Sequence, residues 1–508
     1  MKAETTTMTL PVTVFETGAD KDIEFESTLA DYLPNINRII RADADLICED
    51  VQTNGSKAEV SGKAVFSLLY ESDFKQKLKR ERFETEFSQK FDLRDLPEGD
   101  LFPSAKVKCS YVGCKTLNPR RFILRCRGDI GLTVKCMQRV PVVSMEDSKG
   151  AFFKSKRLSV AEYSSDILRD FNMEETLSLE TAPPIGEIIY TALDFSSPEI
   201  SKSKGSALIR SEATFKCLYE PEDEEADLQM ALRHFPVVLT VEDDAITEES
   251  DLSACLSAGT VESEKDIDSY GENRVIQLRY GVRATLGCIN RNELTVPTDM
   301  FFEEYKNENK ASILPYEEPL KEIKHRFTIE KAFDSAELSM TSCLDLNADA
   351  SVTETVLGDD GISVKGNCGL TLFGQDNGYR SKDFTVPFSV LIPFANEGKE
   401  CIVKSTAAAR NGTAEIAGGR VSVRVPVELS ISVTYKEKVT VLSSADIEKR
   451  VEEEKDGTPI IIYYPAKGES AWDIGKRYFT DPEKVKENNP DSFDKNGNVT
   501  EDGTVLYM

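Results

Sequence analysis

The residues best suited to contact another molecule lie in the last fifty positions of the 508-residue chain, around its single tryptophan. They combine an aromatic ring, two prolines, an amide and charges of both signs, which suits recognition of a surface better than transfer of a chemical group. A solvated face around a packed core, with the tryptophan inside a very small domain, is the alternative. The candidate binding residues are Pro465, Lys467, Glu469, Trp472, Asp473, Lys476, Arg477, Asn489 and Pro490.

Catalytic patterns are missing from the sequence. The two histidines, His234 and His325, lie far apart in the chain, which disfavours a Ser-His-Asp triad or a His-rich metal site. No phosphate-binding loop and no dinucleotide-binding glycine pattern occurs. The eleven cysteines are odd in number and include no C-x-x-C pair, so we expect reduced, mostly buried thiols. We therefore predict no enzyme, no metal and no cofactor.

The charge balance narrows the possible partners. Asp and Glu number 89 against 62 Lys and Arg, a net charge of −27 that repels nucleic acid and anionic lipid. For this reason we expect no nucleic-acid binding. We also expect no direct membrane insertion, because no stretch approaches the roughly 18 apolar residues that span a bilayer. The N-terminal residues lack the apolar core of a signal peptide, so the chain is expected to stay where it is made.

Local signals in the tail predict a strand, two helices and a second strand. The run Ile460–Tyr464 is β-branched and aromatic, as in a buried strand. Ser470 is placed to cap a first helix, and Asp481-Pro482 starts a second that ends before Pro490. Residues 504–507 then supply a closing strand.

This βααβ order, with Trp472 near the start of the first helix, resembles a LysM domain. The resemblance covers about a tenth of the chain. It implies that loops near Ser470 and after Pro490 could hold N-acetylglucosamine chains. The family usually has Thr-Leu-Trp where this chain has Ser470-Ala471-Trp472, and the segment between Pro490 and Gly503 is long and acidic. Both departures put glycan binding in doubt.

The rest of the chain repeats about every 150 residues. Pro34 to Ile40 matches Pro183 to Ile189, and Val60 to Tyr70 matches Ile209 to Tyr219, at the same offset of 149 positions. A looser third copy starts at Val364. Two blocks in fixed order, three times over, indicate duplication rather than chance.

The second block predicts long half-buried strands. It starts at Arg121, Arg274 and Arg420 and runs some fifteen residues in each copy. In the third copy every second residue from Val421 to Val433 is apolar, the period of a strand with one wet face. Each copy should therefore be a β-sandwich or barrel-like unit.

The copies resemble the SPOCS domains of spore-coat and cortex proteins of endospore-forming bacteria. Tandem SPOCS copies followed by one LysM domain resemble the SipL family of spore-coat morphogenetic proteins. We predict a mainly β chain with three tandem SPOCS repeats and a small α+β (βααβ) LysM domain. The predicted boundaries are 1–145, 146–300 and 301–444 for the repeats, 445–456 for a helical linker beginning at Ala445, and 457–508 for the LysM domain.

The resemblance implies a non-enzymatic scaffold of spore-coat assembly. In that family the protein is made in the mother cell and works at the forespore surface, where its LysM tail docks a SpoIVA-like coat protein. The alternative is a wall protein that binds peptidoglycan or chitin-type glycan through the LysM domain. Secretion would separate the two, because a tail kept in the mother-cell cytoplasm never meets peptidoglycan.

Overall fold

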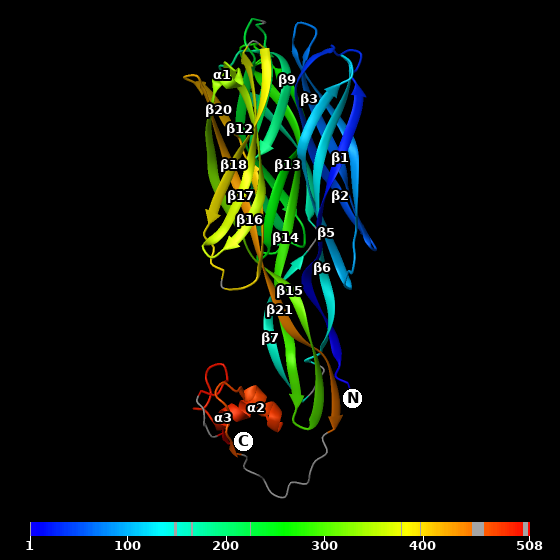
Figure 1. Cartoon of the computed structure of the whole chain (residues 1–508), viewed down its shortest axis with the longest axis vertical. Helices are drawn as coiled ribbons and strands as arrows, with labels where there is room; N and C mark the ends of the chain where they lie inside the picture. The colour runs from blue at the N-terminus through cyan, green and yellow to red at the C-terminus, as the bar shows by residue number, and fades with distance from the viewer. Residues whose placement is uncertain are drawn as a thin grey trace.

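The chain folds into an elongated head and stalk with a small tail beside the end of the stalk (Figure 1). The computed structural model describes residues 2–146, 150–163, 166–223, 225–376, 378–396, 398–449, 462–500 and 506–507. The described parts are mainly β, with short helices in the tail, as the sequence predicted. None of their helices is long and apolar enough to span a membrane.

The first unit of the head consists of two three-stranded antiparallel sheets. Their strand orders are β1-β6-β5 and β2-β3-β4. The first strand pairs with the last one along its whole length, so the chain closes on itself within the unit. The strands are β1 (Thr5–Thr28), β2 (Ile36–Asn54), β3 (Lys57–Ser72), β4 (Leu78–Asp92), β5 (Gly99–Thr116) and β6 (Arg121–Val143).

The second unit has the same strand order with two interruptions. Two short strands, β7 and β8, both pair with β14 in place of a single first strand, and β9 and β10 both pair with β11. The strands are β7 (Ala151–Tyr163), β8 (Ile167–Ser178), β9 (Ile185–Phe195), β10 (Glu199–Ser203), β11 (Ser206–Pro221), β12 (Gln229–Glu242), β13 (Asp251–Asp266) and β14 (Val275–Phe302).

The third unit has the sheets β15-β21-β19 and β16-β17-β18, with β20 also paired to β21. A single helical turn, α1 (Ser335–Leu338), joins the two sheets. The strands are β15 (Tyr305–Asp334), β16 (Ser342–Gly358), β17 (Gly361–Asp376), β18 (Gly378–Ile392), β19 (Cys401–Ala409), β20 (Thr413–Ala417) and β21 (Arg420–Lys449).

The sequence repeats fall at matching places in the three units. Val60–Tyr70 lies in β3, Ile209–Tyr219 in β11 and Val364–Phe373 in β17, and each of these is the middle strand of its sheet. A middle strand covered on both faces needs a nearly continuous apolar run, and β3 is buried at every position from Ala64 to Ser72. The repeated sequence therefore corresponds to a repeated strand order.

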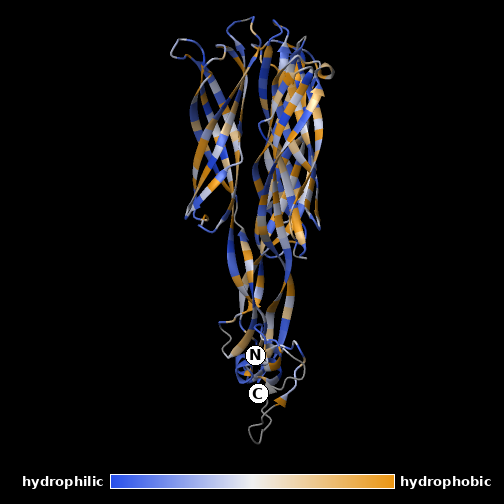
Figure 2. Cartoon of the chain, turned by 90° about the vertical axis from the view of Figure 1, so that its left-hand side faces the viewer, coloured by the Kyte–Doolittle hydropathy of each residue, from blue (hydrophilic) through white to orange (hydrophobic). Residues whose placement is uncertain are grey.

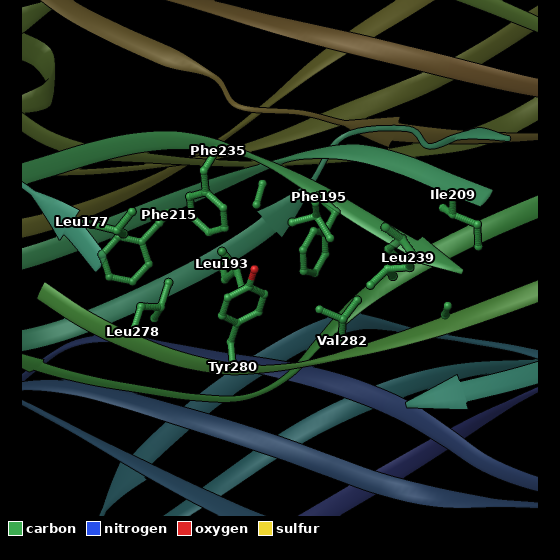
Figure 3. Close-up of a cluster of buried hydrophobic side chains, with 14 of the residues drawn as sticks. Leu177, Leu193, Phe195, Ile209, Phe215, Phe235, Leu239, Leu278, Tyr280 and Val282 are labelled. Carbon is green, nitrogen blue, oxygen red and sulfur yellow. The ribbon is translucent and has the colours of Figure 1, made fainter. Parts of the chain in front are cut away.

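Each unit encloses its own hydrophobic core between its two sheets. Figure 3 shows the core of the second unit, where Phe215 and Phe235 from one sheet face Leu278 and Tyr280 from the other. The rings of Phe235 and Tyr280 meet edge to face at 5.8 Å. In the third unit the predicted alternation from Val421 to Val433 is confirmed, because every apolar member of that run is buried.

The stalk is built from the ends of six strands. β1 with β6, β7 with β14 and β15 with β21 leave the head as three paired ribbons. Polar and apolar residues alternate along these strands, so each ribbon has one apolar face (Figure 2). The three faces form a shared core that contains Met8, Leu10, Val140, Val142, Leu158, Val160, Val296, Tyr316, Val439 and Val441.

The prediction of a helical linker that begins at Ala445 is wrong for residues 445–449. Residues 445–449 continue β21 and pair with Tyr305–Asn309 of β15. Ala445 and Ile447 are buried in the stalk while the residues beside them are not, which is the period of a strand. The third unit therefore extends past its predicted end at 444, and the second continues to Phe302. Residues 450–456 of the proposed linker lie outside the described residues.

The three inner sheets meet along the axis of the head. Leu69, Leu218 and Phe373 occupy the same register position in β3, β11 and β17, and all three belong to one apolar cluster shared by the units. Their strand partners also meet there. Arg41 is paired with Leu69, Tyr190 with Leu218, and Asp345 with Phe373. One polar residue from each unit thus reaches the axis.

These polar residues form a buried network. The Tyr190 hydroxyl donates to Asp345 Oδ2 at 2.5 Å, and Lys216 Nζ donates to Asp345 Oδ1 at 3.0 Å. The Arg41 guanidinium lies 3.7 Å from Asp345 and 2.8 Å from Asp43. Burial opposes ionisation of Asp345, but Lys216 and Arg41 outweigh it and lower the pKa of this carboxyl. The carboxylate therefore holds cations from two other units.

Candidate partner-binding surface

The tail forms the predicted βααβ unit within its described residues. β22 (Ile462–Tyr463) pairs antiparallel with β23 (Leu506–Tyr507), and α2 (Ala471–Tyr478) and α3 (Pro482–Asn488) lie between them in sequence. Residues 460–461 and 504–505 of the predicted strands lie outside the description. The core of the tail consists of Ile474, Val485 and Val499, with Tyr463, Tyr478 and Phe493 packed around it.

Both predicted helix caps are present. The Ser470 hydroxyl accepts from the Asp473 backbone N–H at 3.1 Å and donates to the Asp473 carboxylate at 2.5 Å. The Asp481 carboxylate accepts from the Glu483 backbone N–H at 2.9 Å, with Pro482 at the first helical position. The caps satisfy backbone donors that a helix start leaves free, so these short helices begin where the sequence indicates.

Trp472 does not belong to the core of the tail. Its indole Nε1–H donates to Asp299 Oδ2 of the stalk at 2.9 Å. Its ring meets Phe301 edge to face, with 5.0 Å between ring centroids, and Phe301 stacks on Phe152 of β7. Trp472 is therefore a packing residue, but it does not lie inside the small domain as the alternative interpretation expected. It packs the tail against the end of β14.

Lys476 contacts the same stalk residue. Its Nζ lies 2.6 and 2.7 Å from the two Asp299 oxygens, and the Asn309 amide donates to Asp299 Oδ1 at 2.6 Å. Burial opposes the charge of Asp299, but the bonds from Lys476, Trp472 and Asn309 outweigh it and lower the pKa of this carboxyl. We call the contact of Trp472 and Lys476 with Asp299 and Phe301 the latch.

Glu469 and Arg477 hold the loop between β22 and α2 in place. The Tyr463 hydroxyl donates to both Glu469 oxygens at 2.9 Å, and the Ala466 backbone N–H donates to Glu469 at 3.2 Å. Arg477 pairs with Glu469 at 3.0 Å and lies over the Tyr463 ring. Glu469 is thus largely covered, while the side chain of Arg477 stays 52% exposed.

The nine predicted site residues therefore divide into four groups. Glu469 alone forms the first, since Tyr463 and Arg477 largely cover it. Trp472 and Lys476 lie in the latch. Pro465 and Asn489 are buried, and the Asn489 amide donates to the Val485 carbonyl at 2.8 Å. The members that remain exposed on the tail are Lys467, Asp473, Arg477 and Pro490.

The nine site residues predicted from the sequence do not include two exposed apolar side chains of the tail. Ile462 is 53% exposed and Tyr464 is 66% exposed, while Tyr463 between them packs into the core of the tail. The alternation along this strand was the signal, since an inward Tyr463 turns both neighbours outward. Asp299 and Phe301 were also missed, because nothing in the sequence around β14 indicates contact with residues more than 170 positions away.

The tail carries exposed side chains that another molecule could contact. The described residues contain no group of three or more His, Cys, Asp and Glu side chains that could hold a metal ion. The tail offers a small apolar area at Ile462 and Tyr464, with Lys467 and Arg477 on the same small domain. Exposed aromatic and apolar side chains are among the residues enriched at protein contact surfaces.

One family model matches the chain. The family described as "SipL, SPOCS domain" matches residues 35–115, which cover β2, β3, β4 and nearly all of β5 in the first unit. No curated protein and no solved structure shows significant similarity to the chain. Over residues 35–115 the chain is similar to the SPOCS domain of the SipL family, and this stretch lies within the first unit.

Proposed function

We propose that the chain is a non-enzymatic scaffold of spore-coat assembly whose tail docks another coat protein. The second and third units are proposed to be SPOCS domains as well, because they repeat the strand order of the unit that contains the family match. The tail is proposed to be a LysM domain, on its βααβ order and its capped helices.

The observation that carries the proposal is the exposed apolar pair on the tail. Ile462 and Tyr464 are open to a partner, whereas the Trp472 face of the tail is covered by the stalk. Burial of such a pair at a contact centre contributes most of the binding energy. The exposed cations Lys467 and Arg477 of the same small domain would then act mainly on association rate and selectivity.

The head and the stalk together suit the role of a rigid spacer. Each of the three units contributes one ribbon to the stalk and at least one polar residue to the axial network. The latch then joins the tail to the stalk end through Asp299. A partner held by the tail would be carried at a fixed end of a long β body.

The proposed partner is a SpoIVA-like coat protein, and the proposed place is the mother-cell cytoplasm at the forespore surface. This partner is the one that the resemblance to the SipL family implies, and the match of residues 35–115 to that family's SPOCS domain supports the resemblance. A fluorescent fusion in sporulating cells should give a shell around the forespore. A septal or cell-wall pattern would favour the other candidate.

That other candidate is a glycan-binding wall protein. It is favoured by the LysM-like order of the tail, in which the loops after β22 and after α3 lie side by side through the Gly468 N–H bond to the Val499 carbonyl at 3.0 Å. Calorimetric titration with N-acetylglucosamine oligomers tests it. Micromolar glycan binding, with capture of a SpoIVA-like protein unaffected by tail substitutions, would overturn the scaffold proposal.

A further inference from the structure

Two cysteines of the first unit, Cys109 and Cys126, lie next to each other on neighbouring strands. The eleven cysteines of the chain are free thiols in this structure. Cys109 belongs to β5 and is paired with Gly128 of β6, two residues along the strand from Cys126. Alternate residues of β6 from Phe122 to Ile130 are buried, so Gly128 and Cys126 share the face that points into the unit. Cys109 therefore lies on the same side of the sheet as Cys126.

The core of the first unit brings the two sulfur atoms into contact. Cys126 is 2% exposed inside this core, and Cys109 packs against it. A hydrogen bond joins the two thiols. The pairing of β5 with β6 is interrupted by a β-bulge between Cys109 and Tyr111, where Ser110 is the extra residue. A bulge leaves one residue without a ladder partner and bends its strand, so Cys109 can approach β6 without breaking the regular pairing on either side.

The two thiols differ in access and in acidity. Cys109 is partly exposed and lines a cavity of about 730 Å³ between the three units of the head, whereas Cys126 is buried. The hydrogen bond from Cys126 lowers the pKa of Cys109, although burial opposes this change. The same bond, together with burial, raises the pKa of Cys126. The thiolate is the nucleophilic form of cysteine, so Cys109 is the sulfur that should react first.

The other cysteines of β5 and β6 lack this combination. Cys114, also on β5, is paired with Leu124, and burial raises the pKa of this thiol to about 11. Cys136 of β6 is buried, and burial raises its pKa as well. Cysteines that sense oxidants typically combine a lowered pKa, access from solvent and a second thiol beside them. Cys109 meets all three conditions.

We propose that Cys109 and Cys126 form a reversible thiol–disulfide switch that takes hydrogen peroxide as its oxidant. The Cys109 thiolate attacks one peroxide oxygen and the O–O bond breaks, which gives a sulfenic acid at Cys109 and one water. The Cys126 sulfur then attacks the sulfenic sulfur, the S–S bond forms, and the S–O bond breaks as a second water leaves. Each thiol loses one electron and its proton, and the peroxide is reduced to the two waters. The disulfide then ties β5 to β6 at the bulge.

Mass spectrometry of the full chain after treatment with hydrogen peroxide tests the proposal. We expect a disulfide between Cys109 and Cys126 that makes the chain lighter by two hydrogen atoms and that dithiothreitol reverses. Fragment spectra must place the bond, because Cys109 and Cys114 fall in one tryptic peptide. Cys114→Ser is the matched control and should keep the crosslink, whereas Cys109→Ser and Cys126→Ala should lose it.

The order of attack is tested with dimedone, which labels sulfenic acids. In Cys126→Ala the sulfenic acid at Cys109 has no second thiol to react with, so its labelling should rise at least about fivefold over the parent chain. In Cys109→Ser the buried Cys126 should stay unlabelled. Labelling of Cys126 in place of Cys109 would contradict the proposed order.

Melting curves separate the switch from the fold. The disulfide restricts the unfolded chain, so the oxidised parent and oxidised Cys114→Ser should melt at least about 2 °C above their reduced forms. Cys109→Ser should melt at the same temperature with and without peroxide. The proposal would be overturned by a parent chain that forms no crosslink, or by one in which peroxide joins either cysteine to a different thiol.

Discussion

The carboxylate of Asp299 at the end of β14 accepts from the indole N–H of Trp472 in the tail, at 2.9 Å. The two residues are 173 positions apart, and this contact sets the place of the tail on the stalk. Because Trp472 is the only tryptophan in the chain, its fluorescence reports the latch without any added label.

Asp299→Asn should release the tail. The substitution removes the charge that holds Lys476 and weakens the acceptor for Trp472, and charged hydrogen bonds of this kind contribute about 1.5–3 kcal/mol. Trp472 emission should move to longer wavelength, and acrylamide should quench it more strongly. Glu293→Gln, at an exposed position of the same strand, is the matched control. Unchanged emission in the Asp299 variant would show that the latch does not hold the tail.

Acid should open the same latch. The pKa of Asp299 lies below its ordinary value of 3.8, so its stabilising contribution is complete above that value. It is lost as the pH falls through the lower pKa of the docked state. Trp472 emission should therefore shift below about pH 3.8, the value from which the pKa is lowered. The Asp299→Asn variant should lack this step, and an identical step in both proteins would assign it to general acid unfolding.

The stalk core should be sensitive to truncation. Leu10 is fully buried among the three ribbons, so Leu10→Ala should lower the free energy of unfolding by about 2–5 kcal/mol. Ile313 is 70% exposed in the stalk strand β15. Ile313→Ala should therefore change the free energy of unfolding by less than about 0.5 kcal/mol. Denaturant titration checks both. Equal effects would mean that the ribbons do not share a core.

The axial network should hold the three units together through Asp345. This carboxylate is 3% exposed and contacts Lys216, Arg41 and Tyr190. Asp345→Asn leaves two buried cations without their shared partner, which costs about 3–5 kcal/mol. Denaturant titration should show this loss, with Asp170→Asn as the exposed control. A loss below about 1 kcal/mol, in place of the roughly 3–5 kcal/mol expected when a buried ion pair loses one partner, would contradict the assigned role.

Local signals predicted the tail better than the body. Ser470, Asp481 and Pro482 act within one helical turn, so the helix starts could be recognised from neighbouring residues alone. The alternation from Val421 to Val433 likewise identified β21, because a period of two depends only on which side of one strand is buried.

Features that depend on distant pairing were not predicted. Ala445–Lys449 has helix-compatible residues, and only its pairing with β15 makes it a strand. The contact of Trp472 with Phe301 depends on where the stalk ends. The repeat offset could have pointed to Arg41 and Tyr190, which are 149 positions apart, but not to their contacts with Asp345 of the third unit.

The most direct test of the scaffold proposal is capture of a SpoIVA-like coat protein by the full chain and by its Ile462→Ser/Tyr464→Ser variant. An Ile313→Ser chain controls for loss of an exposed apolar residue outside the tail. We predict capture by the parent chain and the control, at least a tenfold loss in the double variant, and no micromolar binding of N-acetylglucosamine oligomers. Equal capture by all three chains, together with micromolar glycan binding, would contradict the account.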